Sequence, residues 1–459
     1  MLSERLDRNS ARRHAYKRAA VGARPDYSRP TGTDLLPQIE HIVVLMMENH
    51  SYDNYFGVLD RGDGLPAKPV SSSGVAPYHL PSPDQIESVP TQSWDASHIQ
   101  YNGGSCDGFV TSVQVTEPDH ADRAAVSMGY FDGGDLPFYY GLARAFTLAD
   151  RWFCSCLGPT FPNRRFLISG TSNGLTDDDP YHLFDSPPNG TIFDALTAHG
   201  ISWRDYHPGS RAGAIAKRVL GAPGLRLGRL FGHSLARIVP QLLDLADGKV
   251  QFTADLYPLG LGGALSHLAS LDTFFQDAAR GTLPAFCIVD PDFHVYSEEN
   301  PQDVRLGESF AADVITAVMN GSNWSRTLLI WLYDEHGGYF DHVPPPEAVP
   351  PDGRDGPPSF DRLGFRVPAV FVSPYARRGA VDSTVYDHSS VLRLVEQKWN
   401  LPPLTRRDAH AIAPVSALDL AGAPELSVPP LPAPALGAGA WRRASRARRA
   451  EPNGLSRTG

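Results

Sequence analysis

Two unbroken apolar runs, each followed by acidic residues, constrain the fold of this chain most strongly. The first run, IVVLMM at residues 42–47, shows no alternation of polar and apolar side chains and ends in Glu48 and Asn49. A run of this kind is too short for an amphipathic helix and is typical of a strand buried on both faces of a parallel sheet. Because ligands bind outside the carboxyl ends of such strands, we expect Glu48 and Asn49 to lie at a functional site.

The second run, TLLIWLY at residues 327–333, ends in Asp334 and Glu335. If the two strands are neighbours, they lie about 5 Å apart and their terminal carboxylates converge on one point. Like charges at that separation repel each other, and a bound divalent cation is the usual way to hold them together. The two runs therefore predict a metal site at one edge of an α/β sheet.

The chain is long enough for a large core in one elaborated α/β domain, since 42% of its 459 residues are hydrophobic. We assign this main domain to residues 37–424, with an inserted cap segment of mixed basic and apolar character at 211–262. Residues 1–36 are charged and contain prolines, which predicts a flexible extension. Residues 425–459 are rich in Pro, Ala and Arg and are expected to form a disordered tail, with attraction to anionic lipid as the alternative role of its arginines.

Charge and hydropathy exclude some partners and locations. The formal net charge of −10 argues against nucleic acid as a general partner. No apolar segment reaches the roughly 20 residues of a transmembrane helix, and no apolar stretch of the kind found in secretion signals follows the basic N-terminus. We therefore expect a cytoplasmic protein, with a secreted or cell-envelope location as the alternative if the true start lies upstream. The sequence does not determine the oligomeric state.

A short helix is predicted in the segment 157–171. Thr160 is expected at its N-cap, Pro162 fits the first turn, and Gly170 is a natural terminator. The backbone N–H groups at such a helix start can bind an anion. A hydroxyl at Thr160 would therefore lie near a bound phosphate.

Four motifs, in this order, resemble those of one bacterial protein family. They are ENHSYDNYFG at 48–57, NGGSCDGF at 102–109, GPTFPNR at 158–164 and DEHGGYFDHVPPP at 334–346. Together they resemble the phosphoesterase family that contains non-specific phospholipase C and a related acid phosphatase, over roughly residues 38–420. The family's secretion signal has no counterpart in this sequence, which is the one departure from the pattern.

The resemblance implies a fold and a set of site residues. The fold would be a three-layer α/β/α sandwich with a mostly parallel central sheet, as in alkaline phosphatase, and residues 37–424 would be its catalytic domain. The implied metal site consists of Glu48, Asn49, Asp334 and Glu335, and the implied nucleophile is the hydroxyl of Thr160, which would also bind the metal. His98 and His294 match phosphate-contacting histidines of the family more loosely.

Phosphate ester hydrolysis requires a nucleophile and neutralisation of the phosphoryl oxygens. A threonine hydroxyl is unreactive at neutral pH, and a divalent ion can supply its alkoxide. Attack on phosphorus would give a phospho-threonine intermediate that water then hydrolyses. One divalent ion with three carboxylates leaves about −1 by formal charge, so a second cation or positive donors must compensate. The candidate donors are His98, His294 and His342 as catalytic groups, and Arg164 as a substrate-binding group together with Asn49 and Asn163.

Several alternatives stay open at this point. Thr160 could be only a helix cap, His98 a surface residue, and His342 a partner that orients a metal ligand. The oxygen ligands suit Mg²⁺, Ca²⁺ or Mn²⁺, and Zn²⁺ is tolerated in related folds. The leading function is phospholipase C-type cleavage of a phosphate ester, with phospholipid at a membrane surface as the expected substrate. Acid phosphatase activity on small soluble esters is the alternative, and a non-catalytic phosphate- or metal-binding protein is a third reading.

Overall fold

A computed structural model describes residues 22–67, 71–81, 89–178, 186–208, 253–256, 267–351 and 359–450. At its centre lies an eight-stranded sheet with the strand order β10-β4-β9-β8-β1-β7-β5-β6. Its strands are β1 (His41–Met47), β4 (Thr147–Ala149), β5 (Trp203–His207), β6 (Leu268–Ser270), β7 (Phe286–Val289), β8 (Thr327–Tyr333), β9 (Ala369–Val372) and β10 (Val381–Asp382). The strands β9 and β8, and β9 and β4, pair antiparallel, while all other pairs of this sheet are parallel. The prediction of a mostly parallel sheet is confirmed.

The two apolar runs of the sequence form the central pair of strands. Strand β1 pairs with β8 in parallel, and their registers end together at Met47 and Tyr333. Every residue of β8 is buried, as is β1 from Ile42 onward. Strands that are covered on both faces need apolar side chains on both faces, which explains the absence of alternation in the sequence.

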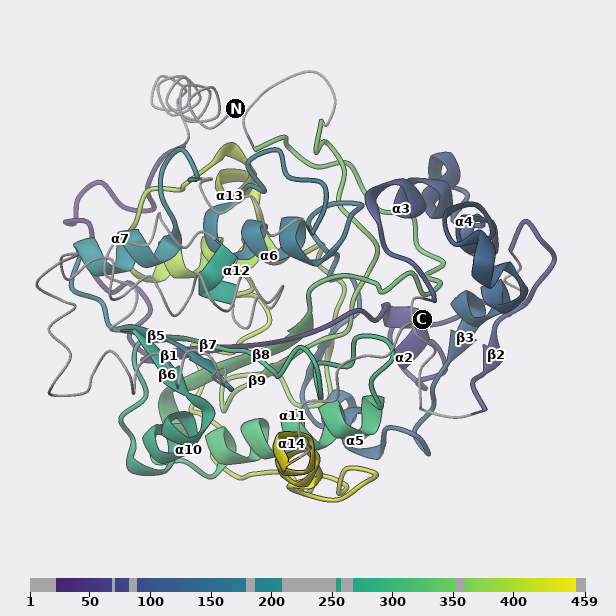
Figure 1. The fold of residues 1–459 in the computed structure, drawn as a ribbon. Coiled ribbons are helices and arrows are strands. Elements are labelled where there is room, and N and C mark those ends of the chain that lie inside the picture. Colours follow the sequence, from purple (N-terminus) through teal and green to yellow (C-terminus); the bar gives the residue numbers. More distant parts are fainter. Residues whose placement is uncertain are drawn as a thin grey trace, which may run out of the picture.

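Helices cover both faces of the sheet and give the three layers that the resemblance implied (Figure 1). One face carries α6 (Thr160–Ser169), α7 (Ile192–Ala198), α12 (His388–Lys398) and α13 (Arg406–His410). The opposite face carries α5 (Pro137–Ala145), α10 (Leu271–Arg280), α11 (Val304–Met319) and α14 (Ala440–Ala450). Beside the sheet lie α2 (Tyr52–Phe56), α3 (Trp94–Tyr101), α4 (Phe109–Thr116) and a small parallel pair, β2 (Tyr78–His79) with β3 (Gly129–Tyr130). Short 3₁₀ turns are η1 (Asn102–Gly104), η2 (Pro118–Met128), η4 (Thr253–Leu256) and η6 (Trp324–Arg326).

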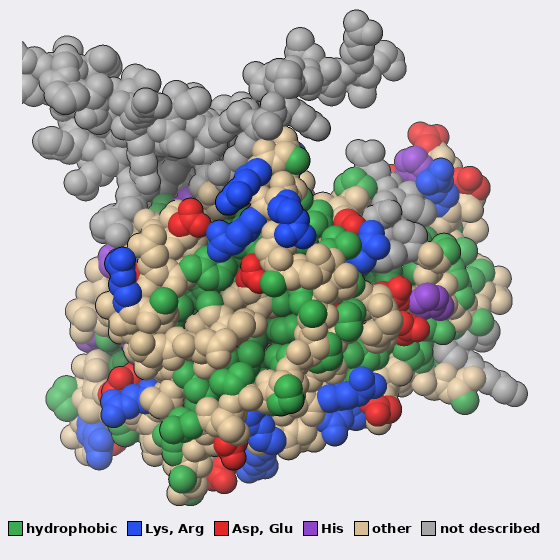
Figure 2. All heavy atoms as spheres, turned by 90° about the horizontal axis from the view of Figure 1, so that it is seen from below, with side chains coloured by type: hydrophobic (Ala, Val, Ile, Leu, Met, Phe, Trp, Pro, Cys, Tyr) green, Lys and Arg blue, Asp and Glu red, His purple; other side chains and the backbone are tan. Residues whose placement is uncertain are grey.

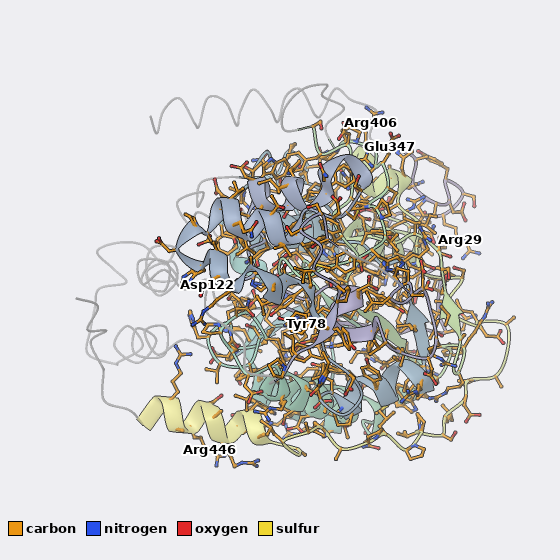
Figure 3. All side chains as sticks on the ribbon, turned by 90° about the vertical axis from the view of Figure 1, so that its right-hand side faces the viewer. Arg29, Tyr78, Asp122, Glu347, Arg406 and Arg446 are labelled. Atoms are coloured by element: carbon orange, nitrogen blue, oxygen red, sulfur yellow. The ribbon has the colours of Figure 1, made fainter. Side chains whose placement is uncertain are left out.

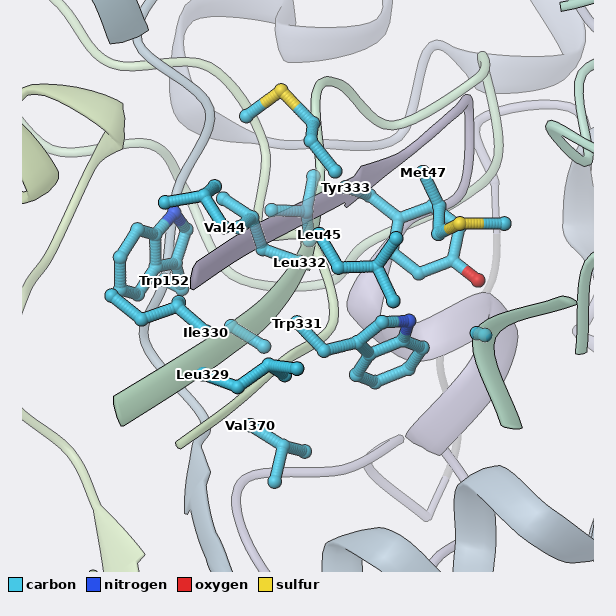
Figure 4. Packing of buried hydrophobic residues seen from close by; sticks show 14 of the residues in the cluster. Val44, Leu45, Met47, Trp152, Leu329, Ile330, Trp331, Leu332, Tyr333 and Val370 are labelled. Carbon is cyan, nitrogen blue, oxygen red and sulfur yellow. The ribbon is translucent and has the colours of Figure 1, made fainter. Parts of the chain in front are cut away.

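The main core is a large cluster that includes β1 and β8 (Figure 4), and two smaller buried clusters lie apart from it. Val44, Leu329 and Trp331 are fully buried within the main core. The rings of Trp331 and Tyr139 lie 4.4 Å apart, which ties α5 to the sheet. Burial of each such side chain stabilises the folded state by roughly 1.5–3 kcal/mol. The strand ends that carry the acidic residues are therefore anchored in the core.

The described ends of the chain are more ordered than the composition suggested. Residues 22–36, predicted as part of a flexible extension, lie against the main domain: the Lys398 ammonium is 2.8 Å from the Asp34 carboxylate, and the Asn400 amide donates to the carbonyl of Asp26 at 2.7 Å. Residues 425–450, predicted as part of a disordered tail, end in the helix α14, which packs on α11. The cause is Trp441, which is only 4% exposed and outweighs the polar composition around it. Residues 1–21 and 451–459 lie outside the described ranges.

The predicted cap at 211–262 also lies outside the described residues, except for η4. No helix in the described ranges is both long enough and apolar enough to cross a membrane.

Candidate active site

The carboxyl ends of β1 and β8 bring the predicted acidic segments together. The backbone N–H of Asp334 donates to the carbonyl of Met47 at 3.2 Å, and the backbone N–H of Asn49 donates to Oδ1 of Asp334 at 3.3 Å. Asn49 has a φ of 68°, a left-handed conformation that Asn tolerates better than most residues. The prediction that the two strands are neighbours is confirmed.

A glycine makes this close approach possible. Gly337 has a φ of +65°, and a Cβ atom at this position would lie 1.8 Å from the carbonyl oxygen of Asn49. The backbone N–H of Gly337 also donates to Oε2 of Glu335 at 2.7 Å. The segment after β8 can therefore fold against Asn49 only with glycine at position 337.

Thr160 lies at the start of α6, one position later than predicted. The N-cap is Pro159 and Thr160 is the first helical residue, so Thr160 does not cap the helix with its side chain. Its hydroxyl is free to turn elsewhere and donates to Oδ1 of Asn49 at 3.4 Å. The predicted end of the helix at Gly170, with a φ of 67°, is confirmed.

Asn163, which was predicted to bind substrate, holds the loop before Thr160. Its side-chain amide donates to the carbonyls of Gly158 at 2.8 Å and Pro159 at 3.0 Å, and its Oδ1 accepts from the backbone N–H groups of Ser155 and Cys156. The side chain is fully buried. Since both of its polar groups are engaged by backbone, Asn163 positions Thr160.

Arg164 is the cation at the centre of the site. Its Nε is 2.9 Å from Oδ2 of Asp334, its Nη1 is 3.0 Å from Oδ1 of Asp290, and its Nη2 is 3.9 Å from Oε1 of Glu48. Burial alone would lower the pKa of Arg164, but the carboxylates, Asp334 first, raise it, so the guanidinium stays charged. A single residue from α6 therefore ties together the ends of β1, β7 and β8.

Thr160 faces a cavity of about 210 Å³. Its polar lining includes Glu48, Thr160, Arg164, Asp178, Thr253, His294 and Glu299. Sequence reasoning missed Asp178, Thr253 and Glu299, because these residues come from loops and a 3₁₀ turn without a strand or motif to mark them. Asp178 has a particular position, since its Oδ1 accepts from the backbone N–H of Phe161 at 2.7 Å and so occupies the anion site at the start of α6.

The neighbouring Glu298 fixes the loop that carries Glu299. Hydroxyl groups of Tyr55, Tyr139 and Tyr333 all donate to its carboxyl group, with distances of 2.6 Å for Tyr55 and 2.5 Å for Tyr139. Burial raises the pKa of Glu298 to about 8, although the three hydroxyls counteract this effect. This buried cluster holds the chain at a φ of 82° just before Glu299 enters the cavity.

The buried carboxylates fit a bound cation in their chemistry. Burial raises the pKa of Glu48, and the charge of Glu299 raises it further; burial and the charge of Asp334 do the same for Glu335. Within the described part of the chain, Oε2 of Glu48 and Oε1 of Glu335 are buried without a hydrogen-bond partner. Orphaned carboxylate oxygens are the ligands that hard divalent ions prefer.

Their spacing shows what binding would require. Two groups of described His and acidic residues have ligand atoms within 4.8 Å of one another, namely Asp53–Asp341–His342 and His79–Asp132–Asp135. Glu48, Asp334 and Glu335 do not form such a group, and Arg164 contacts two of them. A single ion could bind all three carboxylates only if their ligand oxygens came closer together.

The three predicted histidines lie in different places. His294 is exposed at the rim of the cavity. His98 is exposed on α3, where its ring lies 4.6 Å from that of Trp94. His342 binds Asp53 at 2.6 Å beside the buried Arg366, which also pairs with Asp53 and Asp341. Among the described residues, the structure therefore brings only His294 of this set into the cavity of Thr160.

A fourth histidine supports the site from behind. The indole N–H of Trp152 donates to Nδ1 of His388 at 3.3 Å, so Nε2 of His388 carries the proton and donates to the carbonyl of Asp334 at 2.6 Å. Burial lowers the pKa of His388, which keeps the ring neutral. His388 thus fixes the backbone of Asp334.

A hydroxyl at a helix start, beside acidic and cationic groups at the ends of central parallel strands, is an arrangement suited to the hydrolysis of phosphoric esters. Comparison with known proteins gives the family. The chain belongs to the Phosphoesterase family, whose model matches residues 39–402.

Three relatives of the chain are named as phospholipases C. Phospholipase C B of Mycobacterium tuberculosis is 32% identical and aligns over 88% of this chain and 82% of its own length. Non-specific phospholipase C6 of Arabidopsis thaliana is 30% identical over 81% of this chain and 71% of its own. Hemolytic phospholipase C of Pseudomonas aeruginosa is 30% identical over 90% of this chain and 60% of its own. A solved structure of an alkaline phosphatase superfamily protein from Vibrio parahaemolyticus aligns over 87% of this chain and 78% of its own, with 9% identity and a TM-score of 0.38.

Proposed function

We propose that the protein is a metal-dependent phospholipase C, which cleaves the bond between the phosphorus and the glycerol oxygen of a phospholipid with Thr160 as the nucleophile. The position of the Thr160 hydroxyl carries the proposal. It lies 3.4 Å from Asn49, at the meeting point of the two acidic strand ends, and faces the cavity that contains Glu48 and Arg164. The phospholipase C relatives, about 30% identical over most of the chain, support the choice of substrate.

In this proposal, different residues of the chain act as nucleophile, proton acceptor and proton donor. Thr160 attacks phosphorus, and its proton passes to a carboxylate of the cavity, for which we propose Glu299. The bond from phosphorus to the glycerol oxygen breaks, and His294 at the rim protonates the leaving diacylglycerol. Water then hydrolyses the phosphorylated Thr160, which releases the phosphorylated headgroup and restores the hydroxyl.

Glu48, Asn49, Thr160, Asp334 and Glu335 would hold a divalent cation, which when bound would favour the alkoxide of Thr160 and neutralise phosphoryl oxygens. Arg164 holds Asp334 and Asp290 in place through its ion pairs, and it supplies the positive charge that the acidic set lacks. The phosphate enters next to the start of α6, where it replaces Asp178 as the bound anion.

The test is the substitution Thr160→Val, which keeps the shape of the side chain but removes the hydroxyl. We expect turnover of phosphatidylcholine to fall about 10³-fold or more, with the divalent metal content unchanged. Thr160→Ser should retain activity, and Thr282→Val, which removes an exposed hydroxyl that bonds Asp277, serves as the matched control. Undiminished turnover by Thr160→Val would rule out the nucleophile assignment.

A parallel assay on p-nitrophenyl phosphate separates the two phosphoesterase activities. A phospholipase C should release phosphocholine from phosphatidylcholine and leave the monoester almost untouched. Turnover of the monoester alone would instead favour the phosphatase. Mass spectrometry of acid-quenched enzyme should find one phosphate, with its headgroup, on the peptide that contains Thr160.

A further inference from the structure

The helix α14 is strongly basic in a protein that is acidic as a whole. Its 11 residues include Arg442, Arg443, Arg446, Arg448 and Arg449 and no acidic residue, whereas the net charge of the chain is −10. Solvated charges of this density repel one another along a helix. A surface that keeps them in spite of that repulsion is suited to an anionic partner.

The helix is fixed to the main domain at its first turn. The indole of Trp441 is buried, with its ring 5.0 Å from that of Tyr296 and 5.2 Å from that of Phe310, and its N–H donates to Asp313 at 2.9 Å. Farther along, past Trp441, α14 extends beyond the body of the molecule, and Arg446 lies on this part of it (Figure 3). The described arginine side chains, Arg442, Arg443, Arg446 and Arg448, are therefore presented at a defined place on a fixed helix.

That place adjoins the catalytic cavity. The guanidinium of Arg448 donates to the backbone carbonyl of His294, the residue at the cavity rim. On the face that carries α14, Lys and Arg side chains gather in the upper middle of Figure 2. A surface that approaches α14 would thus also approach the entrance of the cavity.

A small cavity of about 160 Å³ lies under the helix, between α14 and the start of α10. Arg442, Arg446, Ser445 and Tyr296 line it, together with Asp272, which pairs with Arg442 at 3.1 Å. Ser445 is only 9% exposed as a residue, and its hydroxyl is buried without a hydrogen-bond partner among the described residues. Arg446 has no ion pair there either. One unpartnered hydroxyl between two guanidinium groups is a suitable set of donors for a phosphate group.

We propose that α14 docks the enzyme on an anionic phospholipid surface, with a lipid phosphate bound by Arg442, Ser445 and Arg446 while the cavity of Thr160 faces the bilayer. This proposal adds a membrane-docking role to the proposed phospholipase C function, and it rests on that function. Lipid is favoured over nucleic acid because the arginines adjoin the catalytic entrance and the rest of the chain is acidic.

Binding can be measured apart from catalysis in the Thr160→Val background, in which vesicles stay intact. The probes are vesicles of pure phosphatidylcholine and vesicles with about one third phosphatidylglycerol, analysed by flotation. We expect strong binding to the anionic vesicles only. The double substitution Arg443→Gln/Arg446→Gln should weaken it about 30-fold, which is about 2 kcal/mol at 1.4 kcal/mol per tenfold. The control Arg29→Gln/Arg123→Gln removes the same charge elsewhere and should bind like the parent.

Three results would overturn the proposal. These are equal binding of the parent to both kinds of vesicle, equal loss in the two double variants, and binding that is unaffected by 0.5 M NaCl. If anionic vesicles fail to bind while a single-stranded oligonucleotide does, and does so through Arg443 and Arg446, the surface is a nucleic-acid surface and the lipid proposal fails. Melting temperatures within a few degrees of the parent confirm that each variant is folded.

An activity arm distinguishes this proposal from the proposed function. In the active enzyme, Arg443→Gln/Arg446→Gln should lower the ratio of turnover on anionic vesicles to turnover on soluble p-nitrophenyl phosphorylcholine. If the parent turns over neither substrate, the proposed function fails, while the vesicle-binding result stands on its own.

Discussion

Arg164 offers the sharpest test of how the site is held together. Its guanidinium makes two short charge-assisted contacts, 2.9 Å to Asp334 and 3.0 Å to Asp290, and all three side chains are buried. Each hydrogen bond to a charged group contributes about 1.5–3 kcal/mol, and removal of one partner of a buried ion pair commonly costs about 3–5 kcal/mol, because the other charge stays buried and unpaired. We therefore expect Arg164→Gln to lower the free energy of unfolding by about 4 kcal/mol.

Urea unfolding at pH 7, followed by circular dichroism, measures this loss. The matched control is Arg144→Gln, which breaks an ion pair of similar length, 3.1 Å to Asp60, between side chains that are 51% and 71% exposed. Solvent screens that pair, so its loss should lower the urea midpoint far less than Arg164→Gln does. If the two variants unfold at similar urea concentrations, the central electrostatic role of Arg164 is wrong.

Three further predictions follow from other parts of the structure. Gly337→Ala should lower turnover at least about tenfold, because its Cβ would collide with the Asn49 carbonyl, while Gly103→Ala, which has a similar φ of +63° but open space around it, should leave turnover unchanged. Because burial raises the pKa of Glu298 from 4.5 to about 8, the folded protein holds a proton there that the unfolded chain releases. Stability is therefore lost as the pH rises from about 4.5 to about 8, and Glu298→Gln should show a smaller difference in urea midpoint between pH 5 and pH 8 than the parent. Chelation followed by dialysis should abolish turnover and lower the melting temperature, with recovery on addition of Mg²⁺, Ca²⁺, Mn²⁺ or Zn²⁺; full activity in protein shown to be metal-free by elemental analysis would contradict the metal site.

The strands were predictable because their signal is local. The unbroken apolar residues of 42–47 are enough to predict a strand that is buried on both faces. The acidic residues that follow them predict which edge of the sheet carries the site. The partners of those acids were less accessible to sequence reasoning. Arg164 was expected to contact substrate, but in the structure it pairs with carboxylates 126 and 170 positions away, which no local pattern encodes.

The histidines and the tail illustrate two other limits. His342 follows the acidic motif closely in sequence, yet a reversal of the chain at Gly337 and Gly338 carries it to Asp53 and Arg366. The composition of α14 predicts disorder, and a single aromatic side chain at Trp441 overrides it because its partners come from distant segments. The average composition of a segment predicts neither the turn that moves His342 nor the packing of Trp441.

The carboxyl group of Asp178 already accepts the backbone N–H of Phe161 at the start of α6. If the phosphate of the substrate binds at this helix start, as we propose, it must take over that hydrogen bond. Its apparent affinity then equals the difference between its own binding and that of the Asp178 side chain, and the return of Asp178 to the N–H favours release of the product. We expect Asp178→Asn to bind inorganic phosphate more tightly in a calorimetric titration, because the competing group is no longer charged, and to have a lower kcat if product release limits the rate.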